Sequence, residues 1–144
     1  MLALANESER VEPEWVVPEG VISLNQILVQ ATGEPHSVLN QSLLESACSR
    51  PKHYWAYGEN DIAALATHLL FGIAKSHPFL QGNKRTAFTA MIGFIGCNGY
   101  ALAMVDGEGC ADHIISVLAD EATEESFTEV LRQLIHLGKP WNGV

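Results

Sequence analysis

The sequence predicts a compact all-α domain, and three observations support that prediction. Apolar residues recur at the three- and four-residue spacing of amphipathic helices in several separate segments. Glycine and proline residues stand near the ends of these segments, where they favour turns. A chain of 144 residues, 47% of them apolar, suits one hydrophobic core. We therefore expect an N-terminal arm over 1–20 and one helical domain over 21–144.

The first helices are predicted from capping residues and from proline. The arm shows no clear period, and Trp15 is expected to hold it against the core. Ser23 opens a Ser-Leu-Asn-Gln run with the spacing of a capping box, which predicts a helix from Ser23 to about Gly33. A second helix is expected over about 38–49. Pro51 should stop that helix, because proline supplies no backbone donor.

The remaining elements alternate between an aromatic segment and strongly periodic helices. Residues 51–60 combine aromatic side chains with a glycine and lack a helical period, which predicts a loop or small hairpin. The later elements follow in chain order: a buried helix over 61–76, a helix that opens with residues 83–85, has its apolar period over 86–97 and is closed by Gly99, a short extended segment over 100–105, a turn at 106–107, a helix over 108–119 and a last helix capped by Thr123 or Ser126 and closed by Gly138.

The segment His-Pro-Phe-Leu-Gln-Gly-Asn-Lys-Arg, residues 77–85, is the candidate site. Pro78 disfavours the helical conformation at His77, so the imidazole should be left at a helix end. Gly82 allows a ligand to approach the backbone, and the amides of residues 83–85 open the next helix. Unpaired amides, the positive end of the helix dipole and two cationic side chains favour an anion. A phosphate fits this description best.

The same residues carry a resemblance to a known family. The pattern His-Pro-Phe-x-x-Gly-Asn-x-Arg resembles the Fic/Doc signature, and the run from Asn83 to Ala87 is similar to its death-on-curing (Doc) branch. The AMP-transferring Fic branch usually has Gly in place of Lys84 and a second Arg in place of Phe88. Further similarity covers roughly 20–137, through Leu43-Leu44-Glu45-Ser46-Ala47, Arg50-Pro51, Gly72-Ile73-Ala74-Lys75 and Asn98-Gly99-Tyr100.

Each residue of the signature has an expected role. His77 is the candidate general base, since a neutral imidazole can accept a proton from an attacking hydroxyl. Gly82, Asn83, Lys84 and Arg85 are the expected phosphate-binding residues, and the two cations would also stabilise charge during transfer. For Asn83, the sequence leaves two roles open: its amide could contact phosphate or tie the loop together.

Three further expectations concern the loop's surroundings. Phe79 is expected to anchor the loop in the core. Gln81 stands where the family usually carries an acidic metal ligand, so we expect only weak Mg²⁺ binding there. The resemblance implies that the aromatic segment 51–60 acts as a target-docking flap, with Tyr54, Trp55 and Tyr57 as its contact residues; the alternative is that this segment simply covers the core.

Composition excludes several classes of protein. Seventeen acidic residues against eight basic ones give a net charge of −9, which argues against general binding to nucleic acid or an anionic membrane surface. No apolar run approaches the length of a transmembrane helix. The three cysteines lack the spacing of a disulfide framework or a zinc site, so a cytoplasmic protein with reduced thiols is expected.

The resemblance implies a function and its partners. Doc toxins phosphorylate a threonine of elongation factor Tu and stop translation, whereas Fic relatives transfer AMP to protein hydroxyls. We therefore expect a Doc-like kinase that uses ATP, with an AMP transferase or a non-catalytic nucleotide-binding relative as alternatives. The chain lacks the inhibitory Ser/Thr-x-x-x-Glu-Gly/Asn sequence of many Fic proteins. A separate antitoxin is therefore the expected inhibitor.

Overall fold

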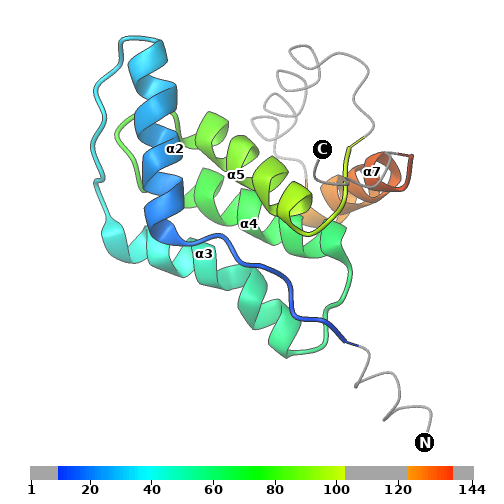
Figure 1. The fold of residues 1–144 in the computed structure, drawn as a ribbon. Helices are drawn as coiled ribbons and strands as arrows, with labels where there is room; N and C mark the ends of the chain where they lie inside the picture. Colours follow the sequence, from blue (N-terminus) through cyan, green and yellow to red (C-terminus); the bar gives the residue numbers. More distant parts are fainter. Residues whose placement is uncertain (1–9, 103–122, 138–144) are drawn as a thin grey trace, which may run out of the picture.

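A computed structural model describes residues 10–102 and 123–137 of the chain. Within these residues the fold is built from α-helices alone, and its extended segments meet in one isolated β-bridge. The prediction of an all-α fold is confirmed. The helices are α2 (Pro18–Ala31), α3 (Gln41–Ala56), α4 (Ile62–Ser76), α5 (Asn83–Cys97) and α7 (Glu124–Leu137) (Figure 1).

Helix α4 lies at the centre of the fold, and α3, α5 and α7 pack around it (Figure 1). Its sequence is apolar on nearly every side, which is typical of a helix surrounded by protein. Gly72 allows α3 to approach closely, because a Cβ at this position would lie 3.3 Å from the carbonyl oxygen of Ala47. The buried α4 residues are Ala63, Ala64, Leu65, Ala66, Thr67, Leu69, Leu70, Phe71, Ile73 and Ala74.

The described part of the N-terminal arm before α2, residues 10–17, packs on the helices, as the sequence predicts for Trp15. The Trp15 ring stacks on Phe94 of α5, with ring centroids 6.0 Å apart, and meets Trp55 of α3 edge-on, with ring centroids 6.1 Å apart. The predicted start of α2 at Ser23 is wrong. The helix begins at Pro18, because a proline at the first helical position lacks only a donor that would be unpaired there, and the Ser23 hydroxyl instead bonds the carbonyl of Glu19.

Helix α3 corrects two predictions about the second quarter of the chain. It begins at Gln41, capped by the Asn40 side chain, rather than at residue 38. It also continues through Pro51 to Ala56, so the loop or hairpin predicted over 51–60 is wrong for residues 51–56. Pro51 is buried within the helix, which indicates that its packing outweighs the hydrogen bond that proline removes.

The later helices agree with the sequence prediction. The Asp61 side chain caps α4 by accepting from the amide of Ala63. Gly99 follows α5 with a positive φ of 87°, and the Thr123 hydroxyl caps α7 by accepting from the amide of Ser126. The turn at 106–107 and the helix predicted over 108–119 lie outside the described residues, as do residues 103–105 of the extended segment and Gly138.

Helix α7 is held to its neighbours by a cluster of charged side chains. Glu124 accepts from Arg50 of α3 at 2.8 Å and lies 2.9 Å from Nδ1 of His68 on α4. Burial opposes the charged form of Glu124, but the hydrogen bonds from Arg50 and His68 outweigh burial and lower its pKa. None of the helices in the described ranges combines the length and the hydropathy needed to cross a bilayer.

Candidate functional site

The site begins where α4 ends, at a residue with unusual backbone geometry. His77 has φ of 50° and ψ of 56°, the left-handed conformation that few residues other than glycine adopt. Pro78 follows directly and disfavours continuation of the helix through His77. The side chain of His77 is exposed to solvent. A strained, exposed histidine at a helix end is typical of a residue held for function.

The loop after His77 is closed by one reciprocal pair of hydrogen bonds. The Asn83 side chain accepts from the amide of Phe79 and donates to the carbonyl of the same residue, both at 2.9 Å. The Phe79 ring is 1% exposed and lies in the core, as predicted. Of the two roles that the sequence left open for Asn83, the geometry supports the structural one.

A buried asparagine that the sequence analysis missed fixes the loop from below. Asn25 on α2 is fully buried, and its amide nitrogen donates to the carbonyl of Gln81 at 2.8 Å and to the Thr86 hydroxyl at 3.0 Å. Its side-chain oxygen lies 2.7 Å from Nδ1 of His36. The Asn25 side chain therefore joins α2, the loop, α5 and the connection that carries His36.

The connection between α2 and α3 runs in an extended conformation beside the loop. The amide of Leu39 donates to the carbonyl of Pro78 at 2.8 Å, and the amide of Leu80 donates to the carbonyl of Ser37 at 3.0 Å. Val38 and Phe79 form the antiparallel bridge at this point. The two backbone segments thus support one another directly at the site.

The loop, the start of α5 and the α2–α3 connection line a pocket of about 490 Å³ that is open to solvent. This volume lies in the range of small-molecule sites, which is roughly 300–1,000 Å³. The lining includes every predicted phosphate-binding residue as well as the candidate base. The residues that line it are Glu34, His77, Leu80, Gln81, Gly82, Asn83, Lys84 and Arg85.

The first amides of α5 lie at this pocket and lack an acceptor within the helix. The helix's first backbone bond runs from the amide of Thr86 to the carbonyl of Gly82, so the amides of residues 83–85 precede it and have no acceptor within the helix. Gly82 has φ of 73° and no side chain to cap these donors. With Lys84 and Arg85 in the same turn, the arrangement favours an anion, as the sequence predicts.

One carboxylate shares the pocket with these cations. Glu34 accepts from Nη2 of Arg85 at 2.6 Å, and the two side chains are 32% and 36% exposed. The hydrogen bond from Thr32, followed by that from Arg85, lowers the pKa of Glu34. Sequence reasoning missed this residue, because the pairing with Arg85 joins positions 51 residues apart.

The residues at this site do not form a metal cage of their own. No group of three or more His, Cys, Asp or Glu side chains within 10–102 and 123–135 could hold a metal ion. Gln81 is exposed in the pocket and presents a neutral amide where a carboxylate would favour Mg²⁺. We therefore assign no chemical step to a metal held by the protein alone.

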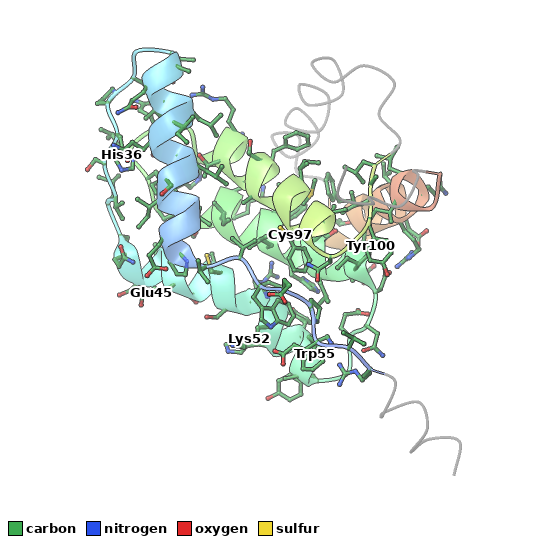
Figure 2. All side chains as sticks on the ribbon, in the orientation of Figure 1. His36, Glu45, Lys52, Trp55, Cys97 and Tyr100 are labelled. Carbon is green, nitrogen blue, oxygen red and sulfur yellow. The ribbon has the colours of Figure 1, made fainter. Side chains whose placement is uncertain are left out.

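The residues predicted to form a docking flap lie elsewhere. Tyr54 stacks on His68 at 3.6 Å, and Trp55 packs against Trp15, so both belong to the helical body. Tyr57 follows α3 and is 93% exposed. In Figure 2, Trp55 lies at the opposite end of the molecule from His36. The segment that does border the pocket is the α2–α3 connection.

The fold and the loop together define the class of protein. The sequence matches the Fic/DOC family over residues 15–95, more than half of the chain and all of the loop. The chain therefore belongs to the Fic/Doc family, as its signature predicts. Its curated relatives place it more narrowly, in the Doc branch.

Two of these relatives carry Doc names. The chain is 34% identical over 93 residues to "Toxin Doc" of Mycolicibacterium smegmatis, a match that covers 62% of this chain and 68% of that protein. It is 26% identical over 120 residues to "Protein kinase doc" of Escherichia phage P1, with 83% of this chain and 94% of that protein covered.

Proposed function

We propose that this protein is a Doc-type toxin that transfers phosphate from ATP to a Ser or Thr hydroxyl of a target protein. The observation that carries the proposal is the shared pocket of His77, Lys84 and Arg85 beside the unpaired amides of α5. A base and an anion site in one pocket are the parts that phosphoryl transfer needs. The names of the two Doc relatives support a toxin and a protein kinase respectively.

The proposed reaction divides between these residues. The acceptor hydroxyl gives its proton to His77 as its oxygen attacks the γ-phosphorus of ATP. The bond from the γ-phosphorus to the bridging oxygen breaks, and ADP leaves with that electron pair. Lys84, Arg85 and the amides of residues 83–85 stabilise the charge on the phosphate oxygens. Mg²⁺ would enter bound to the nucleotide and supply further positive charge to its phosphates.

Phosphate transfer is favoured over AMP transfer by the side chain at position 84. Lys84 lines the pocket where the AMP-transferring branch usually has glycine. The bulk of its side chain narrows the space beside the helix start, and its charge adds to the positive potential there. AMP transfer remains the second candidate, because the same base and anion site serve either orientation of the nucleotide. The relative named as a protein kinase also supports the first candidate.

The proposal includes two protein partners. A kinase of this type needs a target chain, for which elongation factor Tu is the proposed example, and a toxin needs an antitoxin encoded alongside it. The exposed apolar side chains of Leu39 and Leu80 come from the two bridged segments at the pocket. They favour the binding of a partner protein at this surface. Isolation of abundant, active and harmless protein from cells without an antitoxin gene would contradict this part.

Labelled ATP tests the proposed reaction. The purified protein is incubated with a bacterial lysate, Mg²⁺ and ATP labelled separately at the α- or the γ-phosphate, and labelled proteins are then separated. We expect label from the γ-position alone in a protein band. Label from the α-position would instead support AMP transfer. The absence of both labels, with ATP binding retained, would support a non-catalytic nucleotide-binding relative.

A further inference from the structure

The ion pair between Glu34 and Arg85 lies inside the proposed phosphate pocket. Nη2 of Arg85 donates to Oε1 of Glu34 at 2.6 Å, and the Thr32 hydroxyl donates to the same oxygen. Both charged side chains line the pocket together with His77. The carboxylate therefore contacts the guanidinium at the surface that a bound phosphate would use.

A carboxylate and a phosphate compete for the same donors. Both present anionic oxygens to the planar N–H groups of arginine, and both form short charge-assisted hydrogen bonds. An anion that entered this pocket would also experience repulsion from Glu34 itself. Each effect weakens phosphate binding while the carboxylate stays in place.

We propose that Glu34 is an internal competitor for phosphate, which holds Arg85 in the free protein and is displaced when the nucleotide binds. This inference rests on the proposed phosphate site. The sequence lacks the inhibitory motif of many Fic proteins, so no internal inhibitor was predicted. Glu34 does not belong to such a motif, because it lies outside the helices, in the connection after α2. Its contact to Arg85 engages one carboxylate oxygen, and both side chains are about one-third exposed, so the pair can separate.

A positioning role and a competitor role for Glu34 predict opposite changes in phosphate affinity when the carboxylate is removed. If the carboxylate served mainly to orient Arg85 towards phosphate, its removal would leave the guanidinium mobile and weaken binding. If it competes, its removal frees donors and removes a negative charge, so binding tightens. The sign of the change in affinity therefore distinguishes the two roles.

The test compares Glu34→Gln with a matched control. Glu45 is an exposed carboxylate on α3, outside the pocket (Figure 2), so Glu45→Gln changes the net charge by the same one unit. Calorimetry with inorganic phosphate and with ATP gives the affinities, and circular dichroism checks the helical content. We expect Glu34→Gln to bind both ligands about fivefold more tightly, because the guanidinium is released and a negative charge leaves the pocket. Glu45→Gln should stay within about twofold.

A second variant separates contact from charge. Glu34→Asp keeps the charge but draws the oxygen back by about one C–C bond, roughly 1.5 Å. Its affinity should fall between those of the natural protein and Glu34→Gln. Unchanged or weaker binding by Glu34→Gln would overturn the competitor role while the phosphate site stands. If neither the natural protein nor any variant bound phosphate or ATP, the proposed site and this inference would both fall.

Discussion

Replacement of Asn25 by alanine should destabilise the protein and disorder the phosphate loop. The side chain is fully buried, and it bonds the Gln81 carbonyl, the Thr86 hydroxyl and the His36 ring. Three hydrogen bonds at about 1 kcal/mol each give about 3 kcal/mol. The unpaired hydroxyl of buried Thr86 adds to this loss, whereas the better helix propensity of alanine offsets about 0.7 kcal/mol. We expect a net loss of about 3 kcal/mol.

Urea unfolding followed by circular dichroism measures this loss. The control is Gln26→Ala, at the neighbouring exposed position of α2, which should change the free energy of unfolding by less than about 0.5 kcal/mol. A double-mutant cycle between Asn25→Ala and Thr86→Val should give a coupling energy of about 1 kcal/mol, since the two side chains are bonded directly. A loss below about 1 kcal/mol for Asn25→Ala would refute the role assigned to this network.

Three further predictions concern the loop and the charged cluster. Gly82→Ala should lower the free energy of unfolding, measured by thermal unfolding, by about 2 kcal/mol or more, because φ is 73° and a Cβ would lie 3.0 Å from Val29. The control Gly99→Ala, at a position with positive φ but open space, should cost less. Equal losses would contradict a steric contribution from Val29. Glu124→Gln should remove up to about 1 kcal/mol of stability at neutral pH. Its lowered pKa means that the difference from the natural protein should shrink as pH falls below 4.5, and a pH-independent difference would contradict the charged pairing. Gln81→Glu should make nucleotide affinity, measured by calorimetric titration, depend more strongly on Mg²⁺. An unchanged dependence would mean that this side chain does not contact the ion.

The fold was predictable wherever local sequence and burial agree. Helix α4 carries a long apolar period, a capping Asp61 and a terminal proline, and its bounds follow from these signals alone. Pro51 misled the prediction because its removal of a donor is a local cost, whereas the packing that keeps it within α3 involves residues distant in sequence. Capping-box spacing at Ser23 similarly lost to proline at the start of α2.

The loop of the candidate site was predictable from the sequence, but the side chains that contact it from other elements were not. The order His77, Pro78, Gly82 and the following cations already predicts an anion site at a helix start. Asn25 and Glu34 have no such local signal, since each acts through a partner more than 50 positions away. The docking role of the aromatic segment came from the family resemblance and stays a prediction; in the structure Tyr54 and Trp55 contact His68 and Trp15, whereas Tyr57 is exposed.

The His77→Asn variant is the sharpest test of whether His77 is the general base of a transferase. Asparagine tolerates the left-handed conformation found at this position better than alanine does, so the variant should keep the fold while it lacks a proton acceptor of suitable pKa. Single-turnover transfer from γ-labelled ATP, with nucleotide affinity measured in parallel, is the assay. We expect a loss of about 10²- to 10⁴-fold in transfer rate with ATP affinity within about threefold. Transfer at the natural rate by His77→Asn would show that His77 is not the general base.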